Sequence, residues 1–172
     1  MSRRSGSGCE VTDVWREIGD DAPFWERFQE IFEFRPNFYD GSASAIRIPA
    51  GSLVVDLSPI YGADPARYEA GCAAVQAAAV RAFVWLAEDE DLVALDWQHP
   101  SFLWSPADQA VLGGRPAVSV WPDGDYYMHM TRDLRWGTFG HPWQQTLTIW
   151  GADLVGTLGV ELASWLPTRQ VL

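Results

Sequence analysis

The residues best suited to chemistry lie in one aromatic stretch, residues 95–150, which holds all three histidines and six of the ten tryptophans. His99 ends a segment typical of a strand and is followed by Pro100, so its imidazole can reach solvent. A carboxylate such as Asp96 or Asp125 could orient one of the three histidines and raise its basicity. The residue types therefore predict a general acid–base site whose candidate catalytic residues are His141, His99, Asp96 and Asp125.

Of the other two histidines, His141 is the more suggestive of a site residue. His141 lies in Gly140-His141-Pro142, which we expect to be an irregular segment between strands, where functional side chains are often held. A structural role, in which His141 caps the loop by a hydrogen bond, is equally compatible with the sequence. His129 falls in an alternating run, and a hairpin closed at Asp123-Gly124 would place it beside Val118 and bury it.

Aromatic side chains around these histidines are candidates for the walls of a ligand pocket. Tryptophan faces suit planar or cationic molecules, although core packing is their commonest role. We expect two tryptophans near the glycine-rich segment, Trp136 and Trp143, to be partly exposed. The predicted ligand-binding residues are Trp97, Gln98, Tyr127, His129, Trp136 and Trp143.

Several other chemistries are disfavoured by what the sequence omits. No His-x-His, His-x-x-x-His or His-Glu-x-x-His spacing appears, so we predict no metal. No lysine, Gly-x-Gly-x-x-Gly or Gly-x-Ser-x-Gly is present, which argues against Schiff-base, dinucleotide and serine-nucleophile chemistry. The only cysteines, Cys9 and Cys72, do not form a Cys-x-x-Cys pair. The sequence thus predicts cofactor-free proton transfer if any reaction occurs.

Periodicity predicts the elements that position these residues. Helices are expected over 12–34, interrupted near Pro23, over 65–87 after an Asp64 cap, and over 151–166. Residues 106–116 are expected to form a loop. Strands are expected within 45–57 and over 92–99, 102–105, 117–121, 125–131 and 146–150. The pattern favours an α+β fold: one largely antiparallel sheet of about five to seven strands with N-terminal, central and C-terminal helices packed on it.

Length and charge set the remaining expectations. The 172 residues suit one α+β domain over 11–172, after a disordered lead-in at 1–10 that lacks the apolar core of a secretory signal. We find no apolar run near the roughly 20 residues of a membrane span. A cytoplasmic protein is expected. The net charge of −11 disfavours nucleic acid and favours a basic protein or a cationic small molecule.

Several short motifs rich in tryptophan, histidine and tyrosine resemble those of a bacterial family known only as a domain of unknown function. The resemblance covers most of the chain and implies no activity, substrate or site residues. The words that carry it are Ala94-Leu95-Asp96-Trp97-Gln98-His99, Pro122-Asp123-Gly124-Asp125-Tyr126-Tyr127, Trp136-Gly137, Gly140-His141-Pro142-Trp143 and Ile149-Trp150-Gly151, with Phe24-Trp25, Phe34-Arg35-Pro36 and the Asp56 strand.

Three hypotheses about function follow. The first is a small-molecule-binding protein, with or without acid–base catalysis such as hydrolysis, isomerisation or cyclisation. The second is an acidic interaction module, for example an immunity-type inhibitor of a basic toxin, which would use the run Glu88-Asp89-Glu90-Asp91. The third is a structural or regulatory domain in which the aromatic motifs only pack the core. Polar groups that converge on a solvent-reached cavity would favour the first, and a flat acidic patch with exposed aromatics the second.

Overall fold

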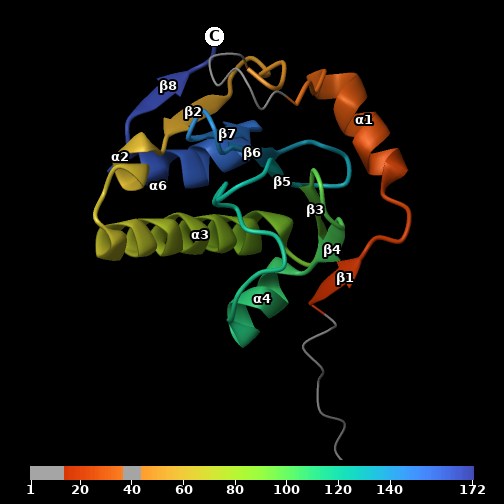
Figure 1. Cartoon of the computed structure of the whole chain (residues 1–172). Coiled ribbons are helices and arrows are strands. Elements are labelled where there is room, and N and C mark those ends of the chain that lie inside the picture. The colour runs from red at the N-terminus through yellow and green to blue at the C-terminus, as the bar shows by residue number, and fades with distance from the viewer. Residues whose placement is uncertain (1–13, 37–43) are drawn as a thin grey trace, which may run out of the picture.

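The fold is α+β and is built on a single antiparallel sheet, as a computed structural model of the chain shows (Figure 1). The structure describes residues 14–36 and 44–172, so the expectation of a disordered lead-in at 1–10 lies outside the described residues. The sheet has eight strands in the order β1-β4-β3-β5-β6-β7-β2-β8. The predicted fold class is confirmed, with more strands than the five to seven expected.

The strands are short, and each pair of adjacent strands runs antiparallel. At the centre, β5 pairs with β3 on one side and β6 on the other. The strands are β1 (Trp15–Glu17), β2 (Leu53–Asp56), β3 (Leu92–Asp96), β4 (Phe102–Trp104), β5 (Tyr127–Met130), β6 (Gly137–His141), β7 (Thr146–Trp150) and β8 (Thr168–Gln170).

Helices cover both faces of the sheet. One face carries α1, whose Phe28 and Phe32 pack with Leu95 and Phe139 in one core cluster. The other face carries the long α3, whose Val75 belongs to a second cluster together with residues of β2, β3 and β7. The helices are α1 (Ala22–Phe32), α2 (Ser58–Tyr61), α3 (Pro65–Ala87), α4 (Pro106–Leu112), α5 (Ala152–Leu154) and α6 (Val160–Ala163), with a π-helical turn at Val155–Gly159 between the last two.

Helix α3 forms as its sequence predicts. Asp64 is extended at the N-cap and its side chain accepts a hydrogen bond from the Arg67 backbone N–H, while Pro65 occupies the first helical position. Val75, Ala79 and Phe83 are fully buried along one stripe. By length and apolar composition alone α3 also meets the test for a membrane-crossing helix, contrary to our expectation, although core helices meet that test too.

The prediction of helix over residues 12–34 was only partly right. Residues 15–17 instead form β1, an edge strand that pairs with β4, and the helix begins at Ala22. Trp15 stacks on Trp104 with ring centroids 4.6 Å apart and an interplanar angle of 2°. This long-range stacking contact holds the segment against the sheet, and the local sequence pattern does not indicate it.

Two further predictions of strands were wrong. The strand expected around Ile46 and Ile48 is irregular, although Ile46 is buried against α1. Residues 117–121 also form no strand, because Gln76 of α3 anchors them: its Oε1 accepts hydrogen bonds from Val120 N at 2.8 Å and Ser119 Oγ at 3.2 Å. The partners of β5 are β3 and β6, so the expected hairpin of 117–121 with 125–131 does not form.

The prediction of a loop over 106–116 was also wrong for most of its length. Residues 106–112 form α4, which Ser105 caps by accepting a hydrogen bond from the Asp108 backbone N–H. The helix ends before Gly113, whose φ of +66° suits glycine. The C-terminal helix predicted over 151–166 is present but divided by the π-helical turn, and β8 follows it.

Candidate functional site

Asp96 is placed by the strongly apolar strand that precedes it. Leu92 to Leu95 are fully buried, and Asp96 is the last residue of β3, with its side chain only 9% exposed. The chain leaves the sheet immediately after, in a turn that ends at Pro100, because a proline cannot continue the ladder of hydrogen bonds. This turn carries Trp97, Gln98 and His99 back beside the end of the strand.

Asp125 reaches the same place from the neighbouring strand. Asp96 of β3 lies opposite Tyr127 of β5 in the register, so the residues just before Tyr127 lie beside the end of β3. The Asp125 carboxylate is buried, and its Oδ1 accepts a hydrogen bond from the Tyr126 backbone N–H at 2.7 Å. The carboxylate at the end of β3 and the one just before β5 are thus held together at the margin of the sheet.

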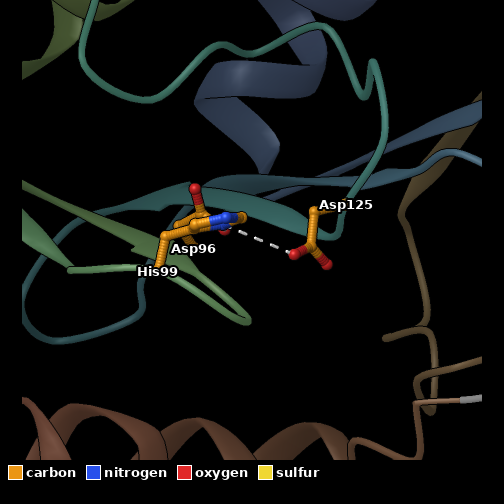
Figure 2. A group of neighbouring side chains, drawn as sticks. All are labelled: Asp96, His99 and Asp125. Atoms are coloured by element: carbon orange, nitrogen blue, oxygen red, sulfur yellow. Dashed lines mark hydrogen bonds and ion pairs between the residues drawn. The ribbon is translucent and has the colours of Figure 1, made fainter.

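His99 bridges the two carboxylates (Figure 2). Its Nδ1 lies 2.9 Å from Asp96 Oδ1, within hydrogen-bond distance, and 3.7 Å from Asp125 Oδ2. The imidazole itself is 63% exposed, in contrast to the buried acids beneath it. We call Asp96, His99 and Asp125 the carboxylate–histidine cluster. Since Nδ1 faces the carboxylates, Nε2 is the nitrogen available to a molecule from solvent.

The environment shifts two of these groups toward protonation. The hydrogen bond and charge of Asp96 raise the pKa of His99 above 6.5. Desolvation opposes this, and the charge of Asp125 adds a smaller raising effect. Burial raises the pKa of Asp125, and the negative charge of Asp96 raises it further. Backbone hydrogen bonds from Tyr126 and Gln98 and the charge of His99 act in the opposite direction.

This arrangement can perform proton transfer. When Nδ1–H donates to Asp96, the neutral imidazole presents the Nε2 lone pair as a base, and the carboxylate stabilises the imidazolium that forms. A buried Asp125 with a raised pKa is suited to hold or supply a proton. The ligand atoms of the three residues also lie within 4.8 Å of one another, so the same groups could hold a cation.

The other two histidines do not join this cluster. Expected in a loop, His141 instead ends strand β6 and is only 1% exposed; its Nδ1 accepts a hydrogen bond from the Gln144 backbone N–H at 3.1 Å. Its ring lies against Tyr126, with centroids 4.9 Å apart. Strand alternation places His141 with Phe139 on the face that α1 covers.

His129 is a core residue on the opposite face. Its ring stacks on Phe83 of α3 and lies edge-on to Trp104. Nε2 lies 3.2 Å from the Ser119 carbonyl oxygen, and Nδ1 has no hydrogen-bond partner among the described residues. Burial lowers the pKa of His129 to about 4. The prediction that it would be buried is confirmed, although its neighbours differ from those expected.

The predicted aromatic wall is only partly at the surface. Trp143 is 38% exposed, as expected, but Trp136 is 2% exposed because it stacks on Phe83 in the core, so the expectation for Trp136 was wrong. Trp97 packs edge-on against Tyr126 and is half-buried. Tyr127 donates a hydrogen bond from its hydroxyl to Asp123 at 2.9 Å.

A second candidate site, a cleft beside α3, is not indicated by any motif in the sequence. This cleft, of about 560 Å³, lies between α3 and the segment 115–123. The sequence placed Tyr68 on the apolar stripe of α3 and Trp121 in an expected strand, but it did not indicate that the two residues meet. Only the contact between the two segments brings them together. The cleft is lined by Tyr68, Glu69, Cys72, Ala73, Gln76, Arg115, Pro116, Ser119, Trp121 and Asp123.

The fold and the site together define a single-sheet α+β domain with a carboxylate–histidine cluster at the sheet margin. Residues 17–155 match the family described as "Protein of unknown function (DUF2716)", and the chain belongs to this family. The matched range includes all three residues of the cluster. The resemblance that the sequence words carry is thereby confirmed.

One curated relative also matches. The chain is similar to the "Uncharacterized protein YxiI" of Bacillus subtilis (strain 168), with 36% identity over 70 residues. The match covers 40% of this chain and 43% of the relative, so it spans less than half of that protein's length. No solved structure matches the chain.

Proposed function

We propose that this protein binds a small organic molecule at the carboxylate–histidine cluster and acts on it by cofactor-free proton transfer, as in hydrolysis, isomerisation or cyclisation. The observation that carries the proposal is the exposed His99 imidazole held by the buried Asp96. Burying two acids near each other has a free-energy cost that an architectural turn does not require. Their convergence on one solvent-reached imidazole favours a site.

The proposed roles follow from position. His99 takes a proton from the ligand, Asp96 orients the imidazole, and Asp125 holds or returns a proton. Trp97 and Gln98, on the same turn, and Tyr127, on β5, are the predicted neighbours of the ligand. His141 and His129, buried on opposite faces, are assigned structural roles instead. The proposal also places the protein in the cytoplasm, where a partly buried thiol such as Cys72 stays reduced.

Two measurements test the proposal. The first is a fragment screen followed by the imidazole NMR resonances, in which at least one compound is expected to shift His99 and not His129. The second is hydrolysis of a panel of nitrophenyl esters, as a probe of general-base activity. His99→Ala is expected to lower the rate about 100-fold.

Arg27→Gln is the matched control for the ester assay, because it changes one exposed side chain on α1. If His99→Ala and Arg27→Gln give the same rates as the wild type, and no fragment shifts His99, the proposal is wrong.

The alternative function is an acidic protein-interaction module, for example an immunity-type inhibitor of a basic toxin. One observation favours it: Trp85, on α3, is 76% exposed shortly before the acidic run 88–91. Against it, Asp91 pairs with Arg16 at 2.5 Å and Glu90 lies 3.8 Å from Arg135, so part of that charge is already neutralised. Trp85→Ala separates the two functions. It leaves fragment binding at His99 unchanged under the first and abolishes binding to a basic protein under the second.

A further inference from the structure

We propose that the cleft between α3 and the segment 115–123 is a binding site for a small organic cation that carries an aromatic or alkyl body. None of Asp96, His99 and Asp125 lines this cleft, so the proposal stands independently of the proposed function. Its volume of about 560 Å³ lies within the range of small-molecule sites.

The aromatic wall of the cleft is held in a fixed arrangement. Trp121 stacks on Tyr61 with ring centroids 4.7 Å apart, and Tyr68 meets Trp121 edge-on at 5.8 Å. The Trp121 indole N–H donates to the Tyr68 hydroxyl at 3.3 Å, and the Tyr61 hydroxyl donates to the Pro122 carbonyl. Both phenols are neutral near pH 7, and burial raises their pKa values further. Tyr61 packs behind Trp121, which is itself only 3% exposed, so Tyr68 supplies most of the aromatic surface that a cation in the cleft can contact.

The charges along the cleft favour a cation. Glu69 and Asp123 contribute two carboxylates, against one guanidinium from Arg115. Asp123 is positioned by the Tyr127 hydroxyl, which donates to its Oδ1 at 2.9 Å. The net charge of −11 adds attraction at longer range. Charge and aromatic surface therefore select the same class of ligand.

The remaining residues that line the cleft are suited to binding a ligand and not to covalent chemistry. Burial raises the pKa of the Cys72 thiol, so the thiol stays protonated and contributes apolar surface. Gln76 is occupied by Ser119 and Val120, and these contacts fix the distance between the two walls. The cleft thus combines a preformed shape with few polar groups, as binding sites do.

Benzyltrimethylammonium is a suitable probe, with benzyl alcohol and benzoate as the neutral and anionic counterparts. Binding to the full chain is followed by NMR through the Trp121 indole N–H resonance. We expect the cation to shift this resonance saturably and to bind at least about tenfold more tightly than either counterpart. Asp123→Asn is expected to weaken cation binding about tenfold, while Glu26→Gln, which removes one exposed charge on α1, leaves binding within about twofold.

The contrary outcomes are distinct. Equal binding of benzyl alcohol would show an apolar site, and tighter binding of benzoate would show an anion site centred on Arg115; either overturns the proposal. So does the absence of a saturable shift, or an equal loss in Asp123→Asn and Glu26→Gln. A second variant, Glu69→Gln on the exposed side of α3, keeps the test informative if Asp123→Asn does not fold.

Discussion

His99 lies three positions after Asp96, and the turn between them brings the exposed imidazole Nδ1 to 2.9 Å from a buried carboxylate oxygen. Asp125 arrives at the same point through the pairing of β5 with β3. The local turn and the long-range register therefore act together. A change in either should be visible in the titration of one surface imidazole.

His129 should make the protein sensitive to acid. Burial lowers its pKa from 6.5 to about 4, so the folded state favours the neutral ring. This contribution to stability is complete above pH 6.5 and is lost as pH falls from 6.5 to about 4, amounting to about 3 kcal/mol by linkage. Denaturant unfolding at several pH values measures it. His129→Phe should show a shallower loss over this window, and an unchanged slope would contradict the assignment.

Gly151 should be among the least replaceable glycines. Its φ is +87°, and a Cβ there would lie 2.4 Å from Trp136 Cβ and 2.7 Å from the Arg135 carbonyl oxygen. Gly151→Ala should cost about 2–4 kcal/mol through backbone strain and overpacking. Gly113, at φ +66° with open space around it, is the control, and Gly113→Ala should cost about 1 kcal/mol. Equal losses in chemical denaturation would show that the contacts of Gly151 are unimportant.

Gln76 should hold the segment 115–121 in place. Its side-chain oxygen accepts from the Val120 backbone N–H and the Ser119 hydroxyl, and Gln76→Ala leaves that backbone donor without this partner. The expected loss of unfolding free energy is about 1–2 kcal/mol. Gln29→Ala, on the exposed face of α1, should stay within about 0.5 kcal/mol. If both variants match the wild type, the anchoring role of Gln76 is refuted.

Stability should not depend on a metal ion. Although the cluster has the residue types and spacing of cation ligands, the His99 nitrogen that faces the carboxylates is already hydrogen-bonded to Asp96. Dialysis against EDTA should leave Tm unchanged, and added Zn²⁺ or Mg²⁺ should not raise it. A fall in Tm on chelation that Zn²⁺ reverses would overturn the prediction of no metal.

Much of the fold was predictable from local patterns. The cap at Asp64 and the stripe on α3 are each encoded in one short stretch and form as expected. The apolar strand β3 also forms, but it ends at Asp96 rather than at His99. Strand β6 was not predicted because glycines such as Gly137 and Gly140 are more typical of loops than of strands. Gly137 is required there by close approach, since a Cβ would lie 2.5 Å from the His129 carbonyl oxygen.

The candidate site was predictable in its residues but not in its geometry. Asp96 or Asp125 was expected to pair with one of the histidines because of the residue types. A strand over 92–99 would have placed His99 and Asp96 on opposite faces, and the turn after Asp96 brings them together instead. Nothing in the sequence excluded His141, because its burial depends on the pairing of β6 with β5 and β7. The cleft beside Trp121 was missed for the same reason, since it requires contacts between segments more than forty residues apart.

The most direct test of the carboxylate–histidine cluster is an NMR titration of all three imidazoles in the wild type and in Asp96→Asn. In the wild type, His99 should titrate above 6.5 because Asp96 stabilises its imidazolium. Any stability that this pair contributes is present below pH 6.5 and is lost as pH rises through the raised pKa. In Asp96→Asn the pKa of His99 should fall, while that of His129 stays near 4. A wild-type His99 that titrates at or below 6.5, or that does not respond to Asp96→Asn, would contradict the account.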